Sequence, residues 1–336
     1  MFVSVCIAAI AMMCTMSPDS RPNLKCDAAR MYSMIEVLAS DSLEGRRAES
    51  GNDLRAAHYL AGEMAGAGCS ALWNDDMIVP FNTKAGGISM SKGQRKWMRR
   101  VLDGEWSDSS CNVVAVIRSG HPNAEKVLLG AHFDHLGRCK ARNDGMWRVG
   151  DMMLGANDNA SGTAAVVEIA RLLQPYAKSF KRDLVVALFG AEEMCVVGSK
   201  HLEGMLRDSS LVVAHMVNLD MLGRMRGDTL VLHGDALAPL DDLVERTPCP
   251  DSLRVCSVPD RFSIGSDHLS FALGMIPVSF FSTSDRSTLH LPTDTPESLD
   301  MRGMERAVDY VAAYVYELLT ADKLPVWSPR AEFTFE

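Results

Sequence analysis

The chain has 336 residues, of which 47% are hydrophobic and 23% are charged, so it can bury one large core or two small ones. Its formal net charge of −9 argues against nucleic acid as the main partner, because phosphate binding needs a basic face. After the first residues, no apolar run approaches the roughly 20 residues that cross a bilayer, and we expect no membrane span.

The first residues, MFVSVCIAAIAMMC, are almost wholly apolar and resemble the hydrophobic segment of an export signal. We predict a signal over residues 1–17 and an exported protein, which makes it periplasmic, extracellular or a lipoprotein of the cell envelope. Cys14 lies in an imperfect lipoprotein cleavage box, so cleavage before Pro18 and lipidation of Cys14 both stay open. No linker is visible, and residues 18–336 are expected to form one catalytic domain.

Nine cysteines are many for a reducing compartment, and an exported chain is expected to pair some of them. Cys249 and Cys256 are close enough in sequence to close a loop, so we predict them as the first pair. The remaining connectivity cannot be deduced from one sequence.

Residues 27–72 are expected to be helical. The segments RMYSMIEVLAS and NDLRAAHYLAGEMAGAG carry apolar residues at helical spacing, and Gly66 and Gly68 mark the end of the second segment.

Short apolar segments typical of strands follow, with helical stretches between them at residues 161–174 and 198–206. Several of these segments are apolar throughout, which indicates strands buried on both faces. The order of strands and helices predicts an α/β fold with a mostly parallel mixed central sheet and helices on both faces. In chain order the strand segments are NVVAVIRS, KVLLGAHF, DLVVALFG, LVVAHMVNLD, TLVLHG and IPVSFFST.

Acidic and imidazole side chains gather where the buried strands end. Ligands of α/β proteins bind beyond the carboxyl ends of the strands, so side chains from separate segments should converge on one edge. The side chains that follow three of the strands or open one helix are His132, Asp134, His135, Asp158, Glu192, Glu193 and Asp220.

This residue set indicates a hard or borderline metal, with zinc favoured by the imidazoles. His132 and Asp134 are two apart at a strand end and can point the same way, so that Asp134 could orient His132 as a ligand. Glu192 and Glu193 repel each other unless a cation lies nearby. If one of them ligates the metal, the other is available as a base.

Each motif alone is weak. An isolated H-x-D, a pair of glutamates or a D-N-A-S-G cap is common without any site, and His135, His268 and His290 taken singly are more typical of surface or core positions. One cap is enough for a helix, however, so the surplus of polar residues in GANDNASG indicates a second role. The joint pattern is specific because order and strand-end placement agree.

With these motifs together, the chain resembles the co-catalytic di-zinc aminopeptidase family, whose relatives include glutamate carboxypeptidase-like enzymes and glutaminyl cyclases. The resemblance runs from about residue 130 to 300, and LASDSLEGRRAESGNDLRAAHYLAGEM extends it toward the N-terminus. It implies a zinc-exopeptidase fold of the phosphorylase/hydrolase type. The matching segments are GAHFDHLG, GANDNASG, GAEEMCVVGSKHL, NLDMLG, GSDHLSF and LHLPTDT.

The resemblance also implies a metal set for two zinc ions. Asp158 would bridge both ions, and the Asp158–Asn159 peptide bond is expected to be cis. Each ion would have two further ligands of its own. The implied metal ligands are His132 and Asp220 on one side, and Glu193 and His290 on the other.

The catalytic roles implied by the resemblance belong to two carboxylates. Glu192 would be the general base for a metal-activated water, and Asp134 would orient His132. The expected activity is that of a di-zinc metallo-exopeptidase that acts on peptides, with aminopeptidase action favoured. Carboxypeptidase or dipeptidase specificity stays open, as does a glutaminyl cyclase with a single zinc. A binding domain that has lost its ligands is disfavoured because no ligand is missing.

Two features depart from the family pattern or lie outside it. Cys195 stands where relatives commonly carry glycine, and two alternatives stay open for its thiol: interference with the zinc, or a buried and inert position. The segment 75–110, which contains SKGQRKWMRR, has no implied role, and its five basic residues are expected to form a solvated face. An anionic substrate or surface contact is the alternative.

Overall fold

The computed structural model describes residues 21–85, 87–88, 92–142, 147–258, 265–283 and 285–329. The expected export signal, including Cys14, lies outside the described residues, so the structure does not test it. Among the helices that are described, none combines the length and the apolar character that crossing a bilayer requires.

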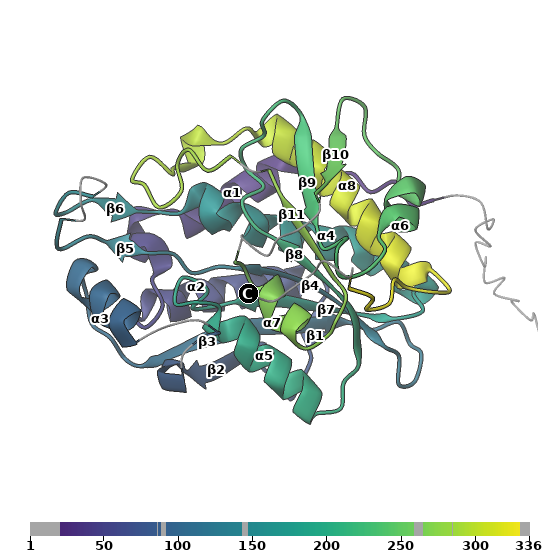
Figure 1. The fold of residues 1–336 in the computed structure, drawn as a ribbon, viewed down its shortest axis with the longest axis horizontal. Coiled ribbons are helices and arrows are strands. Elements are labelled where there is room, and N and C mark those ends of the chain that lie inside the picture. Colours follow the sequence, from purple (N-terminus) through teal and green to yellow (C-terminus); the bar gives the residue numbers. More distant parts are fainter. Residues whose placement is uncertain are drawn as a thin grey trace, which may run out of the picture.

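One sheet runs through the described part of the chain, in the strand order β1-β3-β7-β4-β8-β11-β9-β10, with β2 paired to β3 (Figure 1). All six predicted strand segments belong to it. The short edge strands β1, β2 and β10 were missed because they are exposed or too brief to show a pattern. The bounds are β1 Ser70–Ala71, β2 Ile78–Asn82, β3 Ser109–Ile117, β4 Lys126–His132, β7 Asp183–Phe189, β8 Val213–Leu219, β9 Thr229–His233, β10 Arg254–Ser257 and β11 Val278–Ser282.

The predicted mixed sheet is confirmed: its central strands are parallel, as are the outer strands β9 and β10, and antiparallel pairs join the centre to both sides. Strands β7, β4, β8 and β11 are mutually parallel, and every residue of β4, β7 and β11 is buried. Strand β3 is antiparallel to β7, and β9 is antiparallel to β11. The connections 118–125 and 220–228 hold no helix, and because a parallel return needs a long crossover, the chain reverses direction at both places.

Helices cover both faces of the sheet, as predicted. Helices α1, α2, α4 and α8 contact one another on one face, and α5 and α7 pack together on the other (Figure 1). Each layer has its own apolar cluster against the strands. The helices are α1 Ala28–Leu38, α2 Asn52–Gly66, α3 Lys92–Val101, α4 Gly162–Leu173, α5 Val197–Asp208, α6 Asp241–Arg246, α7 His268–Leu273 and α8 Met301–Thr320.

The predicted disulfide between Cys249 and Cys256 is wrong. The structure has both residues as exposed free thiols. Cys249 Sγ instead donates to the carbonyl of Leu253 at 3.3 Å, and Cys256 lies on the outer strand β10, which pairs with β9. The two thiols are close in sequence but do not face each other, because Cys249 belongs to a turn and Cys256 to an edge strand.

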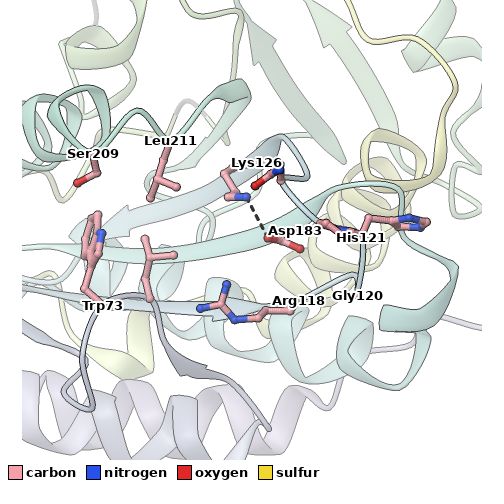
Figure 2. Close-up of a pocket in the computed structure, with 11 residues that line it drawn as sticks. Trp73, Arg118, Gly120, His121, Lys126, Asp183, Ser209 and Leu211 are labelled. Carbon is pink, nitrogen blue, oxygen red and sulfur yellow. Dashed lines mark hydrogen bonds and ion pairs between the residues drawn. The ribbon is translucent and has the colours of Figure 1, made fainter.

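A cavity of about 660 Å³ lies at the amino ends of β4 and β7 (Figure 2). Lys126 and Asp183, the first residues of these strands, form a buried ion pair there with a 3.0 Å separation. Asp183 Oδ1 also accepts hydrogen bonds from the backbone N and the hydroxyl of Ser119. The pair is therefore saturated by the protein itself and holds this end of the sheet together.

Stability should fall on mild acidification because His215 is buried without charge. Burial lowers the pKa of His215 to about 3, and its Nε2 lies 2.8 Å from Ser279 Oγ. The unfolded chain takes up this proton near pH 6.5. The contribution of the neutral imidazole is therefore complete above about pH 6.5 and is lost as the pH falls toward the folded value, at about 1.4 kcal/mol per pH unit.

Urea unfolding of chelator-treated protein at two pH values on either side of about 6 checks this expectation. The His215→Gln variant should lose less unfolding free energy on acidification than the wild type does. The same substitution at the exposed His58 is the control and should leave the pH dependence unchanged. Equal pH dependence in wild type and His215→Gln would contradict the assignment.

Candidate metal centre

The predicted strand-end residues converge on one edge of the sheet. His132, the last residue of β4, has its Nε2 3.3 Å from Asp158 Oδ1 and 3.5 Å from Asp220 Oδ1. Asp220 follows β8 directly, and Asp158 lies in the π-helical turn Ala156–Ser161 that leads into α4. These three side chains offer one nitrogen and two carboxylate oxygens to a common point, with all three ligand atoms within 4.8 Å of one another.

A second ligand group shares Asp158. Its other oxygen, Oδ2, lies 3.3 Å from His290 Nε2, and His290 Nε2 lies 3.1 Å from Glu193 Oε2. His135 approaches the same two carboxylates, with Nδ1 2.8 Å from Glu193 Oε1 and 3.9 Å from Asp158 Oδ2. Asp158 therefore stands between two groups of ligand atoms, which is the position that a bridging carboxylate needs.

His135 is the site residue that reasoning from the sequence missed. It was seen at the strand end but was given no role, whereas the structure buries it completely beside Glu193. Beyond the end of a strand the alternation of faces no longer applies, so spacing could not tell where its ring points. The signal was present only as the second histidine of the HFDH segment.

The surplus polar residues of GANDNASG connect this turn to the loop after β8. Asn157 Oδ1 accepts from the backbone N of Gly223 at 2.8 Å, and Ser161 Oγ accepts from the N of Leu222 at 3.0 Å. Asn159 contacts the residues on both sides of Asp220: its Nδ2 donates to Leu219 O at 2.9 Å, and its Oδ1 accepts from Met221 N at 3.2 Å. The turn thus carries one ligand, Asp158, and positions the loop that carries another.

The backbone of the turn is held from outside by Asp294. Its two carboxylate oxygens accept from the N of Asn157 at 2.8 Å and from the N of Asp158 at 3.0 Å. The Asp158–Asn159 peptide bond is cis, as predicted. Gly155 precedes the turn with φ +66°, and a Cβ there would lie 2.2 Å from the carbonyl oxygen of Asp158, so only glycine fits.

Arg46 stabilises the backbone segments on either side of the site. It is fully buried, and its guanidinium donates to the carbonyls of Phe133, Leu154 and Gly155, with a further 3.0 Å bond to Leu38 O. Burial lowers the pKa of Arg46 to about 10. One cation thereby ties the segment after His132 to the segment before Asp158.

Asp134 lies in the site next to His132, and its role in orienting this ring stays a prediction. His132 Nδ1 is 3.8 Å from Asp134 Oδ1 and 3.2 Å from the backbone carbonyl of Asp134. The carboxylate of Asp134 also accepts from the backbone N of Glu192 at 2.9 Å. Asp134 therefore links the loop after β4 to the loop after β7.

The adjacent glutamates differ in proton affinity. Burial raises the pKa of Glu192 well above its ordinary value, and the carboxylate of Glu193 adds to this effect, while His132 opposes it. Burial also acts on Glu193, but the imidazoles of His290 and His135 outweigh it and lower the pKa of Glu193 to about 2. The neighbouring Glu193 in turn raises the pKa of His290 to about 11. Such a division is typical of one carboxylate that ligates and one that carries protons.

The residues present fit zinc. Imidazole nitrogens and carboxylate oxygens are its usual ligands, and both groups of side chains bring them within coordinating reach. Several buried atoms of the cluster have no hydrogen-bond partner among the described residues, namely Asp134 Oδ2, His135 Nε2 and Asp220 Oδ1. Buried polar atoms without partners are rare, and cations bound between them would satisfy these.

The cluster opens into a cavity of about 340 Å³. Cys195 lies on its wall together with apolar side chains. This cavity is smaller than the one in Figure 2, but it is the one that holds the convergent acids and imidazoles at the carboxyl edge of the sheet.

The basic segment packs beside the metal-centre loops, and the prediction of a fully solvated face is wrong for two of its cations. Arg95 and Arg99, on helix α3, both donate to Asp108, at 2.7 and 2.6 Å. Lys96 and Arg100 are exposed. The two inward arginines are paired because helical spacing puts them on one face, next to a carboxylate that lies nearby only in the folded chain.

The apolar face of α3 joins a small cluster that also contains residues next to the metal-centre side chains, among them Leu136, Ala191 and Met194. The hairpin of β5 Gly137–Arg138 and β6 Met152–Met153 lies at the same end of the molecule as α3 (Figure 1). Trp147, a member of this cluster, donates from its indole nitrogen to the carbonyl of His290 at 2.8 Å. The cluster thereby supports the loops that carry the candidate ligands.

Trp147→Phe should weaken zinc binding by about tenfold, because outer partners of metal ligands affect affinity on this scale. The substitution keeps an aromatic ring against Trp97, whose centroid lies 5.9 Å away, and removes only the bond to His290 O. Competition with a chelating dye measures the affinity. Trp97→Phe, on the outer side of the pair, is the control, and wild-type affinity in Trp147→Phe would refute the role.

Comparison with known proteins agrees with this geometry. A family model described as Peptidase family M28 matches residues 112–315. Aminopeptidase YwaD of Bacillus subtilis is 30% identical over 291 residues, which cover 78% of this chain and 60% of YwaD. An aminopeptidase of Pseudomonas aeruginosa is 31% identical over 160 residues, which cover 47% of this chain and 26% of that protein. The chain thus spans about 60% or less of the length of these two relatives.

Solved structures share the fold. The LapA aminopeptidase of Legionella pneumophila aligns with a TM-score of 0.67 at 20% identity, covering 89% of this chain and 73% of LapA. A glutaminyl cyclase of Bacteroides thetaiotaomicron aligns with a TM-score of 0.64 at 17% identity, covering 89% of this chain and 99% of the cyclase. The family match begins within β3, ends within α8 and includes every residue of the strand-end cluster, and the chain belongs to peptidase family M28.

Proposed function

We propose that this chain is a di-zinc aminopeptidase that removes N-terminal residues from peptides. The observation that carries the proposal is the position of Asp158, whose two oxygens face two separate groups of ligand atoms. The ligands in this proposal are His132 and Asp220 with one ion, Glu193 and His290 with the other, and Asp158 with both. Buried His135 supports Glu193.

Zinc, when bound, would polarise the scissile carbonyl and lower the pKa of a nearby water. Side chains of the protein would transfer the proton and hold the ligands in position. Glu192 lines the cavity, and its high proton affinity suits it to take a proton from the attacking water and return it to the leaving amine. Asp134 holds the backbone of Glu192 in place, and Arg46 keeps the segments that carry His132 and Asp158 together.

Aminopeptidase action is favoured over the alternatives by the names of the two relatives compared above. Glutaminyl cyclase is the second candidate, since one solved structure of this fold carries that name. The fold does not separate the two activities, but the second ligand group around Glu193 favours the di-zinc enzyme.

Hydrolysis of leucine p-nitroanilide by the zinc-loaded protein tests the proposal. We expect turnover that a chelator abolishes and zinc restores, two zinc ions per chain by elemental analysis, and no cleavage of the N-acetylated substrate. Cyclisation of an N-terminal glutaminyl substrate with one zinc per chain would instead identify a cyclase. Cleavage of the acetylated substrate alone would exclude an aminopeptidase.

The proposal includes export of the enzyme, which rests on the apolar residues 1–17 alone. Expression of the full chain in a bacterial host, followed by cell fractionation and N-terminal sequencing, checks it. A mature protein that begins near Pro18 outside the cytoplasm is the expected result. An uncleaved protein in the cytoplasm would contradict export.

A further inference from the structure

The cavity at the metal centre is lined by carboxylates, apolar side chains and one positive side chain. Four carboxylates line it, those of Asp158, Glu192, Glu193 and Asp220. Its apolar wall is formed by Val196, Met221, Leu269 and Leu289. Among the described lining residues the only lysine or arginine is Arg286.

The guanidinium of Arg286 has no partner among the residues that the structure describes. Among the described residues it makes no hydrogen bond or ion pair, and it is exposed to the cavity and solvent. The acid beside it in sequence, Asp285, is already paired with Arg224 at 3.4 Å and Arg226 at 3.8 Å. Arg286 is therefore a cation that the fold places at a binding cavity without using it to hold the fold.

The charge of Arg286 would attract an anionic group of the substrate. Two divalent ions would cancel the four negative charges of the lining carboxylates, and the ligating imidazoles are neutral. Arg286 then leaves the cavity with one uncompensated positive charge. A substrate carboxylate would compensate this charge.

We propose that Arg286 selects peptides that carry a carboxylate in the residue after the scissile bond. This inference rests on the proposed aminopeptidase function and names its substrate class. The carboxylate has two sources, the C-terminus of a dipeptide and an acidic side chain at the second position. One residue spans about 3.3–3.6 Å, so a dipeptide carries its terminal carboxylate close to the reacting bond.

Kinetics with four leucyl substrates test the proposal and separate the two sources. Leu-Gly carries the terminal carboxylate, and Leu-Gly-amide lacks it. Leu-Asp-amide carries only a side-chain carboxylate, and Leu-Asn-amide is its neutral counterpart. We expect the zinc-loaded wild type to have a kcat/KM at least about tenfold higher for one or both acids than for the matched neutral substrate, the range of one charge-assisted hydrogen bond at a partly exposed site.

Arg286→Gln should remove this preference by lowering kcat/KM for the preferred acids about tenfold, mainly through KM, while the neutral substrates change less than about twofold. Arg286→Lys keeps the charge and should restore part of the preference. Arg118→Gln is the matched control, because Arg118 is an exposed arginine at the far cavity (Figure 2). Calorimetry with the reduced-bond analogue of Leu-Gly and its amide gives the same comparison as binding alone.

The outcomes separate this inference from the proposed function. Hydrolysis of all four substrates without preference, or an equal loss on acidic and neutral substrates in Arg286→Gln, overturns the role of Arg286 and leaves the aminopeptidase intact. No hydrolysis of any substrate by the zinc-loaded wild type overturns the proposed function, and this inference falls with it. A preference for Leu-Gly alone identifies dipeptides, and a preference for Leu-Asp-amide alone identifies an acidic second residue.

Discussion

Glu192→Gln is expected to leave two zinc ions bound and to lower kcat by about 10²–10⁴-fold, the usual contribution of a general base. Glu192 lines the cavity, and its Oε2 is 4.0 Å from His132 Nε2, farther than the oxygens of Asp158 and Asp220. The amide keeps the shape of the side chain but cannot accept a proton. Binding should change little, so the loss should appear in kcat rather than in KM.

The neighbouring residue Glu193 provides a matched control for Glu192→Gln. Glu193→Gln makes the same chemical change one position later, where the carboxylate contacts His135 and His290. We expect this variant to lose one zinc ion, whereas Glu192→Gln keeps both. Steady-state kinetics with leucine p-nitroanilide and elemental analysis of both variants provide the comparison. Near-normal turnover in Glu192→Gln would remove Glu192 from its role.

Asp158→Asn is expected to weaken both zinc sites together, and turnover should be lost with the metals. One carboxylate faces both ligand groups, with Oδ1 toward His132 and Oδ2 toward His290, so its charge is withdrawn from two ions at once. The loss in affinity should exceed the about 10–100-fold that outer partners of metal ligands produce. The backbone bonds from Asn157 and Asp158 to Asp294 remain, so the turn should stay folded.

Zinc titration with a competing chelator measures this effect, and thermal unfolding of the metal-free proteins shows that the fold is retained. Asp151→Asn is the control, because Asp151 accepts from the backbone N of Arg148 at 2.7 Å and has no contact with the cluster among the described residues. Loss of one zinc ion with full retention of the other would show that Asp158 belongs to one site only.

The buried central strands could be predicted from the sequence. Strands β4, β7 and β11 are apolar along their whole length because they are covered on both faces, and that pattern needs no partner to be seen. The outer strands and their directions could not be predicted from the sequence. Strand β10 is largely exposed, and the direction of β3 and β9 depends on neighbours that are distant in the chain.

Helix α8 is another element that the sequence alone did not place in the fold. Its amphipathic face extends over twenty residues, with Asp300 as N-cap accepting from Gly303 N, yet it received no place in the predicted order. It follows the last strand, where the alternation of strand and helix no longer guides the assignment. Its position became clear only from its contacts with α1 and α4.

The sequence by itself determined which residue types follow the buried strands, because the carboxyl ends of parallel strands share one edge of the sheet. The family resemblance, and not this geometry, implied the five candidate ligands and the base. Only the tertiary structure decided that His135 turns toward Glu193, that Asp134 accepts from the backbone N of Glu192, and that Arg286 lies on the cavity wall without an ion pair to any described residue. Periodicity specifies the face of a residue inside an element. Beyond the end of a strand, the direction of a side chain is set by contacts with segments far away in the chain, and those contacts exist only in the folded protein.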